Sequence, residues 1–448
     1  MRRLAFFLIA SAPSVALAQT DVDPSTVVPA DTVWVLVAMA FVLVMTPALA
    51  FFYGGLVRAK NVLNTMTMSF ASLGVVLVAW ALLGYTLAFG AGGTLVGDLS
   101  MALLRGVGLE ARGTLPHLLF FGYQGTFVVI AAALVSGAVV ERMRFPAYLL
   151  FIVLWSLVVY APVAHWVWGG GWLSALGALD FAGGAVVHVN AAAAAFVAAL
   201  VVGSRRDYGR RAMLPHHTPF VLLGAGLLWF GWFGFNGGSA LAAGPTAVLA
   251  SVNTLLAPAA TLTVWMLLDL WRTGKATAVG VATGLVVGLV AVTPAAGFVS
   301  PLGALGLGAV AALPSYFAIV LRARTRLDDS LDVVAAHGVG GVVGALLTGV
   351  LADPAWGGQA GLFTGDAARM GVQALSVLAV GAYSAAASFV LLKAIGAVVP
   401  LRATERMERV GLDRADHGEE AYTHGEGAVL VLPGDLPAYA ATPAPALG

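Results

Sequence analysis

Two histidines of this 448-residue chain lie inside long apolar runs, an unusual place for a titratable side chain. His188 lies in GGAVVHVNAAAAAF and His337 lies in AAHGVGGVVGALL. A neutral imidazole offers one hydrogen-bond donor and one acceptor, so two rings can share a bond and still present an edge to a small polar molecule. We therefore expect His188 and His337 to face one another as a neutral pair.

Paired histidines can also bind a metal or serve a purely structural role. The chain contains no Cys, and no third ligand is apparent in either run. We therefore expect no metal and no cofactor, and a structural pair is the alternative that the residues leave open.

Asp180 precedes His188 by eight residues, which is about 12 Å along a helix at 1.5 Å per residue. One small ion therefore cannot contact both side chains. Asp180 is well placed to cap the helix that follows it. Its charge would also favour a cation near the mouth of that helix.

The composition shows which elements must position these residues. Hydrophobic residues make up 60% of the chain and charged residues 10%, with a mean hydropathy of +0.92. A soluble domain could not cover so much apolar surface. The net charge of +1 gives no sign of nucleic-acid binding. The sequence therefore predicts an all-α, polytopic membrane protein.

Spanning a bilayer takes roughly 20 mostly apolar residues. Eleven segments are candidates, of which the eighth is the shortest: 33–56, 62–89, 118–140, 146–167, 184–203, 220–235, 246–271, 278–292, 302–321, 334–351 and 372–399. Residues 1–18 read as a signal peptide, with two arginines, a short apolar core and the cleavage pattern Ala16-Leu17-Ala18. We expect one transmembrane domain over 19–400 and a polar tail over 401–448.

Basic residues predict the orientation of the chain. Connections after odd-numbered spans, together with the tail, hold sixteen Lys and Arg near the spans, whereas the opposite side holds only Arg105, Arg112 and Arg369. Positive charge favours the cytoplasmic side. The mature N-terminus should therefore lie outside and the tail in the cytoplasm. The signal peptide suggests a bacterial inner membrane.

Two pairs of corresponding features suggest an internal repeat. FFYGG at 51–55 ends the first predicted span and FGFNGG at 233–238 ends the sixth, while the two histidines fall in the fifth and tenth. We expect an inverted repeat of five plus five helices, with an extra C-terminal helix. Such repeats place a substrate path at their interface.

Five segments together resemble the ammonium transporter family, which includes the methylammonium permeases and Rhesus proteins. They are YQGTF (123–127), GALDFAGGAVVHVNA (177–191), GWFGFNGGSA (231–240), DVVAAHGVGG (332–341) and GLDRADHGEEAY (411–422). The resemblance implies a homotrimer with one pore per subunit, passage of ammonium or ammonia, and a PII-type regulator at the cytoplasmic face.

Ammonium is a small cation with four N–H donors, so an outer site needs aromatic faces and an acceptor. Trp168, Phe127 and Ser239 fall at outside ends of spans in the predicted topology. Cation–π attraction reaches about 2 kcal/mol in a dry site. The resemblance implies that these three bind ammonium with Asp180 nearby, and that Phe127 and Phe235 form a gate below. Without it, the aromatic residues would read as packing or interfacial residues.

Further residues carry weaker expectations. Tyr160 and Trp232 match family positions near the outer site, Phe52 is a candidate for the pore, and Tyr123 stands where the family usually has Phe. Three acids at predicted cytoplasmic span ends read as caps or ion-pair members: Glu141, Asp269 and Asp332. His165 could line the outer vestibule.

The predicted function is ammonium transport, with cation binding, deprotonation and passage of the histidine pair. An enzyme is disfavoured because no nucleophile–base pair is apparent. An ammonium sensor usually carries a larger cytoplasmic domain than 401–448 could form. A Rhesus-type gas channel lacks the outer aromatic site, whereas Trp168 is present here.

Overall fold

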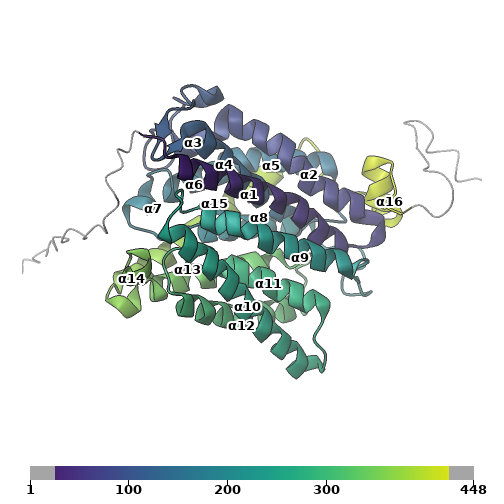
Figure 1. Cartoon of the computed structure of the whole chain (residues 1–448). Helices are drawn as coiled ribbons and strands as arrows, with labels where there is room; N and C mark the ends of the chain where they lie inside the picture. The colour runs from purple at the N-terminus through teal and green to yellow at the C-terminus, as the bar shows by residue number, and fades with distance from the viewer. Residues whose placement is uncertain (1–25, 423–448) are drawn as a thin grey trace, which may run out of the picture.

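The structure, a computed structural model, describes residues 26–422. The predicted signal peptide and the last part of the predicted tail lie outside the described residues. Long helices lie side by side in one bundle (Figure 1). The helical elements and two short strands are α1 (Pro29–Leu56), η1 (Ala59–Asn61), α2 (Val62–Ala79), η2 (Trp80–Gly84), α3 (Tyr85–Phe89), η3 (Ala102–Leu104), β1 (Ala111–Arg112), β2 (Leu115–Pro116), α4 (His117–Ser136), α5 (Phe145–Trp155), η4 (Ser156–Tyr160), α6 (Ala161–Val167), α7 (Trp172–Ala175), η5 (Gly184–Val189), α8 (Asn190–Val202), α9 (Thr218–Trp232), η6 (Phe233–Gly237), α10 (Pro245–Thr273), α11 (Ala278–Val292), α12 (Pro301–Arg322), η7 (Val334–Val339), α13 (Gly340–Leu351), α14 (Pro354–Gly357), η8 (Leu362–Thr364), α15 (Ala368–Gly396), α16 (Glu405–Val410) and η9 (Asp413–His417).

The predicted spans are confirmed as helices. Within residues 26–422, ten helices are long and apolar enough to cross a membrane, and α11 is a shorter apolar one. The length of α11 has a structural explanation, because most of its residues are buried against neighbouring helices. A helix enclosed by protein does not have to match the thickness of the lipid. The chain is an all-α, polytopic membrane protein.

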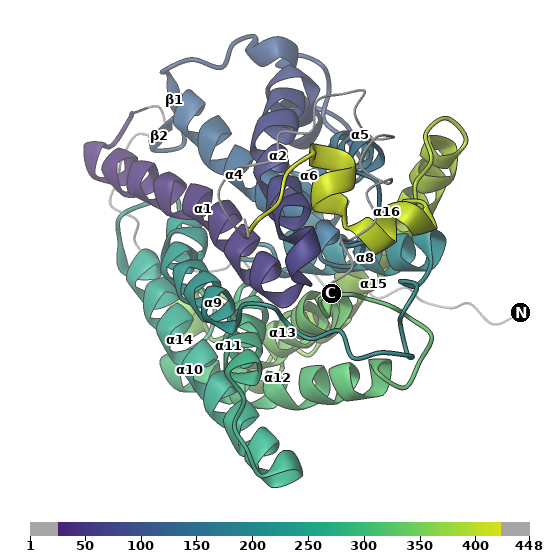
Figure 2. The ribbon, with the colours of Figure 1, turned by 90° about the vertical axis from the view of Figure 1, so that its right-hand side faces the viewer.

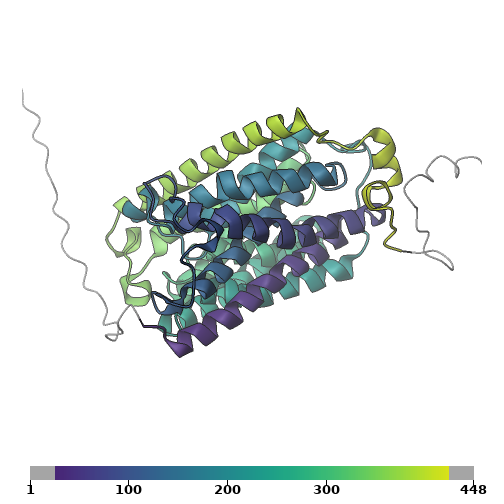
Figure 3. The same ribbon diagram turned by 90° about the horizontal axis from the view of Figure 1, so that it is seen from above.

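The helices follow the predicted plan of five, five and one. The fifth and tenth spans correspond in detail, since each begins with a π-helical turn, η5 or η7, that contains its histidine. These two turns contact each other in the interior. The eleventh span, α15, runs along one side of the bundle, as the yellow-green helix in Figure 3 shows.

Glycines allow helices to approach closely, both between the two halves and within the second half. A Cβ on Gly224 of α9 would lie 2.4 Å from the backbone nitrogen of Phe52 in α1. A Cβ on Gly344 of α13 would lie 2.2 Å from the carbonyl oxygen of Ala291 in α11. Close backbone contact of this kind is a main source of helix association in membranes. The high glycine content of the sequence therefore serves packing.

The two ends of the bundle differ. We call one the hairpin end, because strands β1 and β2 pair there in antiparallel register. We call the other the tail end, because α16 and η9 pack over it, as the view in Figure 2 shows. The basic connections of the sequence analysis, including Arg58 and Arg205, lie at the tail end.

A buried ion-pair network ties the two halves together at the tail end. The Glu141 carboxylate pairs with Arg58 and with Arg205, each at 2.9 Å. Arg205 also pairs with Asp328 at 2.8 Å, and Arg142 donates to the carbonyl oxygen of Asp328 at 2.5 Å. Burial alone would raise the pKa of Glu141, but the bonds and charges of the two arginines hold it below its usual range.

The C-terminal segment docks through its own acidic residues. The Asp413 carboxylate accepts the backbone N–H of Asn64 at 2.7 Å, near the start of α2. The Asp416 carboxylate accepts the backbone N–H of Phe145, the first residue of α5, at 3.1 Å. Free N–H groups at a helix start carry partial positive charge and favour a carboxylate. The tail thus caps two transmembrane helices.

Candidate functional site

Three aromatic rings meet near the hairpin end. The rings of Phe127 (α4) and Phe235 (η6) are stacked, with centroids 4.2 Å apart and planes 18° apart. The ring of Trp168, which directly follows α6, is nearly perpendicular to that of Phe127, with a centroid distance of 6.1 Å. Both phenylalanines are buried, whereas Trp168 is partly exposed. The structure brings together these residues, which are far apart in the sequence.

The hydroxyl group of Ser239 lies beside this stack. It donates to the carbonyl oxygen of Phe235 at 2.8 Å, and the Tyr123 hydroxyl lies 3.4 Å away. Because its proton is used by a carbonyl, the Ser239 oxygen keeps lone pairs that can accept a bond. Aromatic faces and an acceptor oxygen are what a small cation with N–H donors requires.

Asp180 has two separate structural roles. Its carboxylate accepts four backbone N–H bonds of 2.5 to 3.0 Å, from the consecutive residues 183–186 that open η5. Its main-chain carbonyl oxygen accepts the indole N–H of Trp168 at 2.8 Å. The cap expected from the sequence is therefore present, and it is more extensive than a single side-chain bond.

Helix α15 holds the loop in front of Asp180. The Gln373 amide accepts from the N–H of Leu179 and donates to its carbonyl oxygen, both at 2.7 Å. It also donates to the carbonyl oxygen of Ala345 at 3.0 Å. Arg369 donates to the carbonyl oxygen of Gly177 at 2.5 Å. Gln373 was not singled out from the sequence, and Arg369 was counted only among the basic residues opposite the tail. Only their polarity in an apolar helix could have indicated a role for them.

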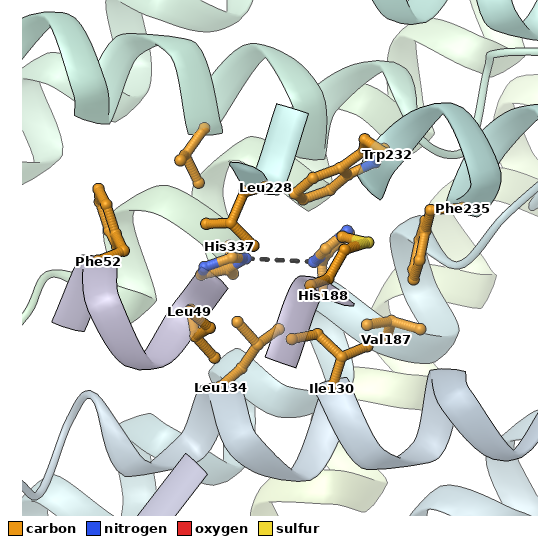
Figure 4. A pocket seen from close by; sticks show the side chains of 12 residues that line it. Leu49, Phe52, Ile130, Leu134, Val187, His188, Leu228, Trp232, Phe235 and His337 are labelled. Atoms are coloured by element: carbon orange, nitrogen blue, oxygen red, sulfur yellow. Dashed lines mark hydrogen bonds between the residues drawn. The ribbon is translucent and has the colours of Figure 1, made fainter. Parts of the chain in front are cut away.

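The structure brings the side chains of His188 and His337 together in the interior. The Nδ1 atoms of His188 and His337 are 3.2 Å apart, and the rings are nearly parallel. The two side chains point toward each other within an apolar cavity, next to Trp232 and Phe235 (Figure 4). The centre of a water-sized molecule can occupy about 10 Å³ inside the cavity. The cavity therefore holds about one such molecule.

A wider space opens between the histidine pair and the tail end. This vestibule has a volume of about 300 Å³ and is lined by His337, Asp332 and Arg322, among others. Asp332 pairs with Arg322 at 2.5 Å. A stack, a one-molecule cavity and a vestibule therefore follow one another through the bundle.

Asp329 was also missed by the sequence analysis. It precedes His337 by eight residues, the same spacing that separates Asp180 from His188. Its carboxylate accepts the N–H of Val334, the first residue of η7, at 2.7 Å. Burial, followed by the charge of Asp332, raises the pKa of Asp329 to about 7. Comparing the residues before each histidine would have revealed this repeat-related acid.

The weaker candidates have mixed outcomes. Trp232 stacks on His188 and donates to the Thr293 hydroxyl at 2.9 Å, and Phe52 lines the cavity. Both ring nitrogens of His165 lie against carbonyl oxygens, of Ala88 and Gly93, so this histidine braces a loop. Three acids form caps or ion pairs, as predicted: Glu141, Asp269 and Asp332. Tyr160 is buried among neighbouring side chains.

Comparisons with known proteins agree with this arrangement. The sequence profile of the Ammonium Transporter Family matches residues 33–422. An ammonium transporter of Aquifex aeolicus is 47% identical over 397 residues, covering 88% of this chain and 93% of the relative. The crystal structure of Candida albicans Mep2 aligns with a TM-score of 0.81 and 36% identity, over 85% of this chain and 88% of the other. A structure described as a sensor Amt protein aligns with a TM-score of 0.82 and 27% identity, over 87% and 98%.

Proposed function

The chain belongs to the ammonium transporter family, and on that premise we propose that it moves ammonium or ammonia through a pore in each subunit. The observation that carries this proposal is the His188–His337 pair, enclosed in an apolar cavity beneath the Phe127–Phe235 stack. A path this narrow admits about one small molecule at a time, and the imidazole nitrogens can form hydrogen bonds with it.

In the proposed path, ammonium binds first at the hairpin end. The ring of Trp168 and the face of Phe127 supply cation–π attraction, and the Ser239 oxygen accepts an N–H bond. The carboxylate of Asp180 adds negative charge nearby. This carboxylate already accepts backbone N–H groups at the start of η5, so it attracts the cation mainly through its electric field. Asp180 also fixes the position of Trp168 through its main-chain carbonyl oxygen.

Deprotonation follows from the character of the cavity. Removing a whole cation from water costs several kcal/mol or more, and the cavity lining offers apolar side chains and two imidazoles in return. Neutral ammonia has one lone pair and three donors, which the paired rings can match. We therefore infer that ammonium gives a proton to water at the hairpin end before the Phe127–Phe235 stack, which acts as a gate, and that ammonia passes the histidines.

The setting of the protein is part of the same proposal. The hairpin end faces outside and the tail end faces the cytoplasm of a bacterial inner membrane, with 1–18 removed as a signal peptide. Three copies assemble as a homotrimer. A PII-type regulator docks at the tail end, where residues 411–422 are held against α2 and α5.

A sensor of the same fold is the second candidate, favoured by the likeness to the sensor Amt protein. Purified protein in liposomes separates the two. An imposed inward ammonium gradient should give internal ammonium accumulation together with a measurable current or pH change. A transporter supports sustained flux, and absence of flux in correctly folded protein would contradict the proposal.

Current and uptake recorded together also separate two modes of transport. Charge movement in proportion to uptake indicates that the separated proton crosses as well. Uptake with internal alkalinisation and no current indicates passage of neutral ammonia, as in a Rhesus-type channel.

A further inference from the structure

The hydroxyl group of Tyr123 connects the two elements that carry the Phe127–Phe235 stack. Tyr123 lies one helical turn before Phe127 on α4, so both side chains lie on one face. Its ring meets Phe127 edge to face, with centroids 5.0 Å apart. Its hydroxyl donates to the carbonyl oxygens of Gly234 and Phe235 in η6, at 2.9 and 3.1 Å. One buried side chain thus spans from α4 to η6.

Resting on the function proposed above, we propose that the Tyr123 hydroxyl is a positioning group that holds the Phe127–Phe235 gate closed and limits the size of molecule that passes. Passage requires the two rings to separate, because stacked rings with centroids 4.2 Å apart leave no space between them. A bond from α4 to η6 opposes any separation that involves a shift of either backbone.

The backbone of η6 does not depend on this bond. The Gly234 carbonyl oxygen also accepts the N–H of Gly238, and the Phe235 carbonyl oxygen also accepts the Ser239 hydroxyl. Removing the Tyr123 hydroxyl therefore leaves neither carbonyl without a partner. The usual cost of a buried, unpaired polar group does not arise. The hydroxyl is placed to affect how easily the gate opens more than whether the protein folds.

Substrate size enters through the width of the opening. Methylammonium carries one methyl group more than ammonium, so its passage needs a wider separation of the same rings. A hydrogen bond that opposes separation of the rings therefore slows the passage of methylammonium more than that of ammonium. The structure therefore assigns to Tyr123 a part in specificity, acting through Phe127 and Phe235 without touching substrate.

The test is Tyr123→Phe, which removes one oxygen and keeps the ring. Ammonium and methylammonium uptake are measured in liposomes against concentration, per amount of inserted protein. We expect the maximal ammonium rate to rise about two- to tenfold, the range that one neutral hydrogen bond supports. The ratio of maximal methylammonium to ammonium rates should also rise. The half-saturation concentration for ammonium should change by less than about twofold, because the outer site is kept.

Tyr383→Phe is the matched control. Tyr383 also donates its hydroxyl to a carbonyl oxygen, that of Val158 at 2.7 Å, but it lies on α15 outside the proposed path. It should lose a similar bond without change in either rate. Unfolding temperatures of the two variants should be similar.

Three outcomes would overturn the proposal. They are wild-type rates and a wild-type ratio in Tyr123→Phe, a loss of rate for both substrates, or the same gain in the control variant. If the wild type itself transports neither substrate, the proposed function fails first. The two failures are therefore distinguishable.

Discussion

The indole N–H of Trp168 donates to the main-chain carbonyl oxygen of Asp180 at 2.8 Å, so the aromatic ring at the hairpin end is held by the residue that also caps η5. Because η5 carries His188, movement of Asp180 would displace the aromatic residues at the hairpin end and the histidine pair together. The positions of Asp180 and Trp168 therefore depend on each other.

We expect Asp180→Asn to lose most ammonium uptake and also some stability. Both carboxylate oxygens accept two backbone N–H groups each. An amide keeps one oxygen and turns an NH2 group toward the other pair of donors. Each buried N–H left without an acceptor costs about 1–3 kcal/mol. The general equivalence of Asn and Asp as caps therefore does not extend to Asp180.

The measurement is uptake normalised to the amount of folded protein in the membrane, with the unfolding temperature recorded alongside. Asp180→Glu, which keeps the charge, is the comparison and should retain part of the uptake. Normal uptake and normal stability in the Asn variant would reduce Asp180 to a replaceable cap.

Replacing either histidine of the pair by Ala should damage selectivity more than stability. The shared 3.2 Å contact is lost, the partner ring keeps an unpaired nitrogen, and the cavity widens enough to admit more water. We expect potassium to leak through His188→Ala and through His337→Ala. Potassium flux in liposomes is the readout, with His216→Ala, outside the proposed path, as the control. Wild-type selectivity in both variants would favour a purely structural pair.

Gln373→Leu should raise the half-saturation concentration for ammonium. The change removes all three bonds of the Gln373 amide and releases Leu179, the neighbour of Asp180. Trp168 then loses its fixed position through the Asp180 carbonyl. The matched control on the same helix is Ser388→Ala, because the Ser388 hydroxyl has no partner among residues 26–422. An unchanged half-saturation concentration in Gln373→Leu would show that this support is dispensable.

Truncation of the tail should separate docking from the residues that follow it. A chain ending after Leu430 keeps residues 411–422 and should bind a PII-type regulator normally. A chain ending after Val410 lacks Asp413 and Asp416 and should not bind. Binding of regulator to purified protein is the measurement. Equal binding by both chains would exclude the docked segment from the interface.

Docking of the tail should weaken as the pH rises. Burial raises the pKa of Asp413 from 3.8 to about 6, so the docked state binds more protons than the released state between these values. Docking is then strongest below about pH 4 and declines until the pH exceeds about 6. Protease cleavage of the tail should be faster at pH 7.5 than at pH 5. Burial lowers the pKa of His417 in the same segment, which acts in the opposite direction. Asp413→Asn should therefore remove or reverse this difference, and cleavage that is still faster at pH 7.5 would assign the effect to another group.

The sequence was sufficient to predict the spans, and it named several residues that the structure brings together. Long apolar runs have few structural alternatives, so even the short span at 278–292 was found at its observed bounds. His188 and His337 stood out because a titratable group is costly in such runs. The pairing of Phe127 with Phe235 came from resemblance, because nothing in local sequence links two rings on different helices.

What the sequence did not reveal depends on contacts between distant elements. Gln373 bonds to Leu179, 194 residues away, and a single glutamine in an apolar helix gives no sign of its partner. The four N–H bonds of Asp180 require a wide π-helical turn, which has no clear sequence signature. The Tyr123 hydroxyl looked like a minor change from Phe until its partners in η6 were known.

The buried network of Glu141, Arg142, Arg205 and Asp328 also bears on the order in which the chain is made. Its basic members follow the third and fifth spans, whereas Asp328 follows the ninth. During synthesis Arg205 can already pair with Glu141, but the bonds of Arg205 and Arg142 to Asp328 must wait, and an incompletely paired buried charge is unfavourable. The first five helices can therefore enter the membrane early but cannot complete this network at the tail end until the ninth has been inserted. An arrested or truncated chain would keep a hydrated, charged gap there, by which cellular quality control could distinguish it from a finished one.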